Sequence, residues 1–140
     1  MTVFFEDIVI GQTAEYARTV TEADVVLFAG VTGDTNPMHL NQEFAETTRF
    51  KGRIAHGALT VSFVSTVLGT QLPGPGTIFL ALNARFKAPV HIGDTVTARV
   101  TVTAIDPERK RVSLATQCLV KGLPVLEGDA LVMAPCRAEG

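Results

Sequence analysis

The spacing of apolar and polar residues changes about halfway along the chain. Residues 56–72, HGALTVSFVSTVLGTQL, have apolar or small residues on nearly every side of a helical projection. A helix that is apolar on all sides is typically buried on all sides. At 1.5 Å per residue this helix would span roughly 25 Å, about the width of a small domain. The pattern therefore predicts one long helix inside the core.

After residue 77 the apolar positions recur every second residue. Four segments alternate in this way, at 77–87, 95–105, 111–120 and 125–134, and turn-forming sequences separate them. A period of two is typical of strands, and short connections favour antiparallel neighbours. A weaker alternation at 12–20 indicates a further strand. The pattern predicts an α+β fold in which a mostly antiparallel β-sheet wraps around the long central helix.

Two shorter helices are predicted before the long one. Thr21 and Asp24 have the spacing of a capping box, which predicts a helix over about 22–31, and Gly33 closes it. Asn41 can cap a second, shorter helix that begins directly after it.

Composition and charge describe an ordinary globular protein. The 140 residues are 46% hydrophobic and 19% charged, with a net charge of −2. No repeat or linker divides residues 1–140, which are read as a single domain. The only basic run, ERKRV, is short, so nucleic acid and anionic membranes are poor partners. No apolar run approaches the roughly 20 residues of a membrane span, and the acidic N-terminus is unlike a signal peptide. We expect a cytoplasmic protein.

The sequence offers no pattern for a metal or a bound cofactor. Cys118 and Cys136 are the only cysteines, and we interpret them as free thiols. The three histidines are scattered without metal-ligand spacing. LPGPGT, at 72–77, has prolines where a phosphate-binding loop must present backbone N–H groups.

A polar cluster, VTGDTNPMHL at 31–40, lies between the predicted helices. Its residue types are those of ordinary turns, so it can be read as a loop that ends a helix. However, Asn36-Pro37 disfavours helix at residue 36, and a tight turn there could bring the Asp34 carboxylate and the His39 imidazole to one point. Such a pair can hold a water molecule, with one group taking its proton and the other giving a proton to the substrate. Without a nucleophilic Ser or Cys nearby, this reading favours addition or removal of water over acyl transfer.

Gly57 could complete such a site. In the first turn of a helix the N–H groups have no intrahelical partner and the helix dipole is positive. Because glycine has no side chain, the Gly57 N–H would be open to a carbonyl oxygen on which negative charge develops. A glycine required only for packing explains this position equally well.

Three segments resemble the MaoC-like, (R)-specific enoyl-CoA hydratases. FAGVTGDTNPMHLNQEFA (28–45) contains the G-D-x-N-P-x-H core of the hydratase signature, and the segments RIAHGALT…S…LG (53–69) and RFKAPVHIGD (85–94) lie where that family has matching sequence. The resemblance extends from about residue 8 to about residue 133, with Met38 where the family more often has Leu, Ile or Val. It implies a hot-dog fold, usually as a homodimer whose sheets join edge to edge.

The resemblance also implies the reaction, which is reversible (R)-specific hydration of trans-2-enoyl-CoA to (R)-3-hydroxyacyl-CoA. Asp34 and His39 would be the catalytic pair, Gly57 would hold the substrate carbonyl, and Asn36 and Ser65 would have supporting roles. Which of Asp34 and His39 moves which proton is left open. Coenzyme A is part of the substrate, so no cofactor or metal is expected.

Several alternatives remain open. A hot-dog acyl-CoA thioesterase usually has a carboxylate on or near the central helix, and residues 56–72 contain no Asp or Glu. A non-catalytic acyl-binding subunit would not need both Asp34 and His39. Acyl-carrier-protein thioesters and branched or dicarboxylic acyl groups are further possible substrates. The pathway, whether fatty-acid breakdown or polyhydroxyalkanoate supply, is also open.

The remaining polar residues are expected to have structural or surface roles. His56, at the start of the long helix, is expected to fix local hydrogen bonds. Five cations are expected to be mostly solvated, with one or two of them meeting coenzyme A phosphates; they are Arg49, Lys51, Arg53, Arg85 and Lys87.

Overall fold

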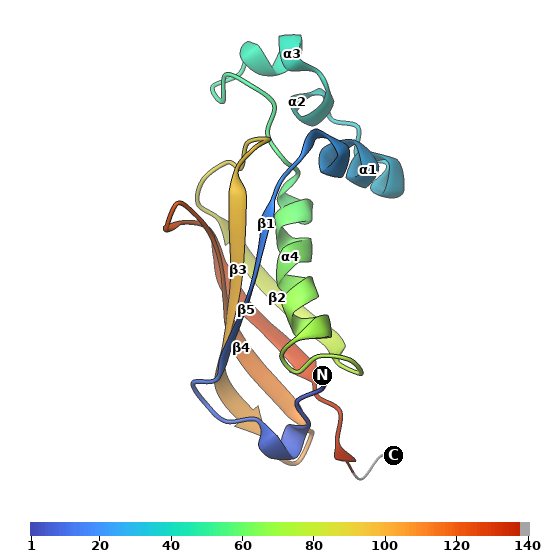
Figure 1. The fold of residues 1–140 in the computed structure, drawn as a ribbon, viewed down its shortest axis with the longest axis vertical. Coiled ribbons are helices and arrows are strands. Elements are labelled where there is room, and N and C mark those ends of the chain that lie inside the picture. Colours follow the sequence, from blue (N-terminus) through green and yellow to red (C-terminus); the bar gives the residue numbers. More distant parts are fainter. Residues whose placement is uncertain (138–140) are drawn as a thin grey trace.

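In the computed structural model of the protein, a five-stranded antiparallel sheet lies against one long helix (Figure 1). The structure describes residues 1–137. The sheet has the strand order β1-β3-β4-β5-β2, and all neighbouring pairs are antiparallel. The strands are β1 (Thr13–Thr19), β2 (Ile78–Phe86), β3 (Thr95–Asp106), β4 (Arg111–Val120) and β5 (Leu123–Met133). All five agree with the alternating segments of the sequence, and the predicted α+β arrangement is confirmed.

The long helix, α4 (Gly57–Thr70), forms the core together with the inner face of the sheet. Its buried residues pack against alternating residues of β3 and β4, as the period of two predicts. The prediction that this helix is buried on all sides is wrong, since Ala58, Ser65 and Gly69 are exposed. The reason is that the sheet covers only one side of the helix. The other side has small residues, which leave little apolar area in contact with water.

Three shorter helices precede α4 and stand beyond one end of the sheet (Figure 1). They are α1 (Glu22–Thr32), α2 (Pro37–Leu40) and α3 (Gln42–Glu46). The capping box of α1 is confirmed, because the Thr21 side chain accepts from the Asp24 N–H and the Asp24 carboxylate accepts from the Thr21 N–H. Gly33 ends α1 with φ of 80°, as predicted, and the Asn41 side chain caps α3. The sequence pattern does not predict α2 or the short 3-10 helix η1 (Phe5–Asp7).

Two of the wider expectations also concern the fold. No helix within residues 1–137 is long and apolar enough to cross a membrane. Cys118 and Cys136 are both buried, and neither forms a disulfide in the part of the chain that the structure describes. Burial raises the pKa of the Cys118 thiol to about 12, so this cysteine is an unreactive core residue.

Candidate active site

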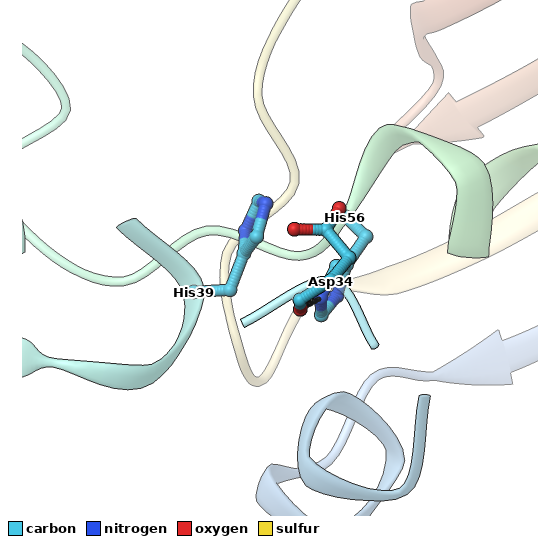
Figure 2. Close-up of side chains that lie close together, drawn as sticks. All are labelled: Asp34, His39 and His56. Carbon is cyan, nitrogen blue, oxygen red and sulfur yellow. Dashed lines mark hydrogen bonds between the residues drawn. The ribbon is translucent and has the colours of Figure 1, made fainter. Parts of the chain in front are cut away.

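Asp34, His39 and His56 come together at the N-terminal end of α4. Figure 2 shows the three side chains arriving from the loop after α1, from α2 and from the residue before α4. One polar atom of each side chain lies within 4.8 Å of those of the other two. Asp34 is exposed, whereas both imidazoles are buried. The structure thus brings together Asp34 and His39, which the turn at Asn36-Pro37 was expected to do.

Local hydrogen bonds in the loop fix this turn. The Asn36 N–H donates to Asp34 Oδ1 at 3.3 Å, and Asn36 Oδ1 accepts from the Met38 N–H at 3.0 Å. Asn36 is therefore the N-cap of α2, and Pro37 occupies the first position of that helix, where a missing N–H costs nothing. The new helix begins in a different direction from α1 and presents His39 toward Asp34. Asn36 orients the loop, in keeping with the supporting role expected for it.

The His39 ring has one nitrogen committed to the protein. His39 Nδ1 lies 2.7 Å from the Ile54 carbonyl oxygen. A carbonyl can only accept a hydrogen bond, so Nδ1 carries a proton in this position. That leaves Nε2 as the nitrogen that can exchange a proton with a substrate.

His56 supports both of the other residues. Its Nε2 lies 2.9 Å from the Asp34 backbone oxygen, so this nitrogen donates and holds the loop in place. Its ring stacks on that of His39, with 3.9 Å between centroids and 28° between planes. Nδ1 of His56 is buried without a hydrogen-bond partner among the described residues, and the residue is 1% exposed. The expectation that His56 fixes local hydrogen bonds is confirmed.

The stacked rings also bear on metal binding. Asp34, His39 and His56 are a donor set of a kind that binds cations. A shared ion would have to lie in the plane of both imidazoles, about 2 Å from a nitrogen of each. Planes that are 28° apart and whose ring centres are separated by 3.9 Å meet well beyond that distance. The geometry therefore disfavours one ion bridging both histidines. That the protein needs no metal stays a prediction.

Gly57 is the first residue of α4 and lines a cavity of about 280 Å³ together with His39. A Cβ atom at this position would lie 2.9 Å from the far end of the Phe86 ring, so a larger residue would require this exposed side chain to shift. Its N–H is also at a helix position that has no intrahelical acceptor. A role of Gly57 as a hydrogen-bond donor to the substrate carbonyl and a role in packing are both compatible with this geometry.

Ser65 is placed apart from these residues. It lies about two turns further along α4, it is exposed, and it is not among the described residues that line the cavity with His39 and Gly57. The supporting role that the family resemblance assigns to Ser65 stays a prediction.

Arg53 is the residue that sequence reasoning missed. The expectation that it is solvated is wrong, since its side chain is 12% exposed. Its Nε donates to the His39 carbonyl oxygen at 2.6 Å, and its Nη1 donates to both carboxylate oxygens of Glu22, at 2.7 and 2.8 Å. Arg53 therefore ties α2 to the start of α1. The spacing of residues in the sequence does not distinguish Arg53 from the nearby exposed Lys51, because both hydrogen-bond partners of Arg53 come from other segments of the chain.

The sheet wrapped around a long helix, with a polar loop at the N-terminal end of that helix, defines a hot-dog protein with a candidate water-activating site. The model of the MaoC-like domain family matches residues 7–122. The chain belongs to this family.

Curated relatives and solved structures agree with this assignment. The chain is 57% identical to an (R)-specific enoyl-CoA hydratase of Rhodospirillum rubrum, over 96% of this chain and 93% of the relative. It is 46% identical to a 3-hydroxybutyryl-CoA dehydratase of Methylorubrum extorquens, over 97% and 87% of the two chains. The solved structure of R-hydratase PhaJ1 from Pseudomonas aeruginosa superposes with a TM-score of 0.92 at 42% identity, covering 97% of this chain and 88% of that one.

Replacement of Arg53 by methionine tests the attachment of α2. Arg53→Met keeps the apolar stem but removes the bonds to Glu22 and to the His39 carbonyl, which would be left partly buried and unpaired. We expect the free energy of unfolding to fall by about 1–2 kcal/mol, measured by urea denaturation at fixed protein concentration. Amide exchange of residues 38–41 should also accelerate. Lys87→Met is the matched control, because Lys87 is an exposed cation. Equal stability of the two variants would contradict the assigned role.

Proposed function

We propose that the protein catalyses reversible (R)-specific hydration of trans-2-enoyl-CoA to (R)-3-hydroxyacyl-CoA. The observation that carries this proposal is the convergence of the Asp34 carboxylate and the His39 imidazole at the N-terminal end of α4. The 57% identity to the Rhodospirillum rubrum (R)-specific enoyl-CoA hydratase supports the same reaction. An acyl-CoA is accordingly the proposed substrate.

In the proposed mechanism, Asp34 and His39 hold a water molecule over the C2=C3 bond. Asp34 takes a proton from the water as the water oxygen bonds to C3. The electron pair of the double bond moves toward C2. C2 then takes the proton that His39 carries on Nε2 when both of its ring nitrogens are protonated, and transfer of the proton from Asp34 to Nε2 restores both groups. Each acid–base role is typically worth about 10²- to 10⁴-fold in rate.

Gly57 has the third role in this mechanism. Its N–H donates to the thioester oxygen, where negative charge develops as C3 is attacked, and one such donor is typically worth about 10²- to 10³-fold. The thioester carbonyl is the electron sink, so the proposed reaction needs neither a metal nor a bound cofactor. A thioesterase reaction is less well supported, since α4 has no Asp or Glu.

The same proposal includes a cytoplasmic location and a place in fatty-acid or polyhydroxyalkanoate metabolism. A solved relative from Aeromonas caviae, 40% identical to this chain, is described as an (R)-hydratase involved in PHA biosynthesis.

We also propose that the protein is a homodimer joined through β2. This strand is one edge of the sheet, and its large apolar side chains are 37–57% exposed; they are Ile78, Phe79, Leu80, Leu82 and Phe86. An exposed apolar edge strand is an aggregation hazard in a monomer. The opposite edge, β1, instead carries the exposed polar residues Thr13, Glu15, Arg18 and Thr19. Pairing of two β2 edges would continue the sheet across the dimer.

Loss of activity in Asp34→Asn tests the catalytic role. The wild-type enzyme should remove the ultraviolet absorbance of crotonyl-CoA and give the (R)-3-hydroxy product. Asp34→Asn should keep the fold by circular dichroism and lose at least about 100-fold in kcat, because the amide cannot take the proton of water. Asp129→Asn, the same change at an exposed position of β5, is the control. Retention of roughly a tenth or more of wild-type activity by Asp34→Asn would contradict the assignment, and release of free CoA would indicate a thioesterase.

A charge on the apolar edge tests the dimer. Leu82→Asp should convert the protein to a monomer in sedimentation velocity, since a carboxylate would lie among the apolar side chains that the two β2 strands bring together. Ala17→Asp, at an exposed position of the other edge strand, should leave the dimer intact. A wild-type protein that sediments as a monomer, or a Leu82→Asp protein that stays dimeric, would overturn this arrangement.

A further inference from the structure

The cavity that His39 and Gly57 line also has positively charged residues in its lining. Its lining comes from five parts of the chain, which are α2, the segment 49–55, the start of α4, the segment 86–90 at and after the end of β2, and β5. The exposed cations Arg49 and Lys87 belong to this lining, and none of the lining residues is an Asp or a Glu. The cavity therefore connects a candidate reaction centre to a cationic rim.

Four of the twelve Lys and Arg residues form ion pairs with carboxylates within residues 1–137, and Arg49 and Lys87 are among the eight that do not. Arg18 pairs with Asp24, and Arg99 pairs with Glu15. No ion pair involving Arg49 or Lys87 is found within residues 1–137. The protein has a net charge of −2, so the missing ion pairs at Arg49 and Lys87 do not result from a shortage of carboxylates. Two unpaired cations at one cavity are a suitable site for an anionic group of a ligand.

The structure also distinguishes Arg49 and Lys87 from the other three cations that the sequence offered as candidates for binding coenzyme A phosphates. Arg53 is occupied by Glu22 and the His39 carbonyl. Arg85 lies opposite Glu127 in the β2–β5 register. Neither Arg85 nor Lys51 belongs to the lining of the cavity. Arg49 and Lys87 are the two of the five that face the cavity.

We propose that Arg49 and Lys87 bind the phosphates of the coenzyme A portion of the substrate. This inference rests on the proposed function, because it takes the thioester to lie at Gly57 and His39. The pantetheine arm would then occupy the cavity and lead outward past the Phe50 and Phe86 rings, which also line it. The Arg49 guanidinium already lies 5.1 Å from the Phe50 ring centroid, which holds it near the rim. Arginine binds phosphate through paired N–H donors, and lysine acts as a point charge.

Two thioesters of the same acyl group test this phosphate site. Crotonyl-CoA carries phosphates, whereas the N-acetylcysteamine thioester of crotonate carries none. For the double variant R49E/K87E we expect KM for crotonyl-CoA to rise at least tenfold, with kcat within about twofold of wild type. The kcat/KM for the N-acetylcysteamine thioester should be unchanged, which also shows that the variant is folded. Added salt should raise the wild-type KM for crotonyl-CoA much more than that of the variant.

The matched control is R109E/K121E, which makes the same change of charge at two exposed positions in the β3–β4 and β4–β5 turns. This control should leave KM for crotonyl-CoA within about twofold of wild type. An unchanged KM in R49E/K87E, or an equal rise with both thioesters, would overturn the phosphate site while leaving the hydratase intact. A wild-type protein that hydrates neither thioester would instead overturn the proposed function itself.

Discussion

The site depends on three hydrogen bonds from side chains to backbone carbonyls, which join the loop and helix after α1 to the approach to α4. His56 donates to Asp34, His39 donates to Ile54, and Arg53 donates to His39. Asp34 and Ile54 lie outside the named helices and strands, and His39 lies in the four-residue helix α2, so these three carbonyl oxygens are satisfied by side chains. Satisfying them in this way fixes the loop against α4. The distance between the Asp34 carboxylate and the His39 imidazole is therefore set by the attachment of the loop to α4.

The rest of the fold makes the attachment rigid. One side of α4 is buried against the sheet, through residues such as Val64, Val67 and Leu68, so the first turn of the helix has a fixed place. The Gly57 N–H is therefore oriented before a substrate arrives, which is the condition under which a hydrogen-bond donor contributes most to stabilising developing charge. The exposed Asp34 can reach water, while the buried His39 has a single nitrogen free for proton transfer. The two groups thus have different environments suited to different roles.

Much of the fold could be predicted from the sequence because it follows from local rules. Alternation identified every strand, the Thr21 capping box and Gly33 bounded α1, and Asn36-Pro37 indicated the turn that brings Asp34 to His39. What could not be predicted depends on contacts between distant segments. The buried role of Arg53 arises from partners in two other helices, and the open side of α4 arises because one sheet covers only half of a helix. The cavity with its cationic rim likewise requires residues from segments about forty positions apart.

The central claim is that Asp34 and His39 act on one face of the substrate double bond, because their polar atoms lie within 4.8 Å of each other. Its most direct test is hydration of crotonyl-CoA in D₂O, with the configuration at C2 and C3 of the product determined by NMR. Delivery of oxygen and deuterium from the same side predicts a single deuterium at C2, added syn to the hydroxyl group, in a product of (R) configuration at C3. Anti addition, or a product of (S) configuration, would contradict the account.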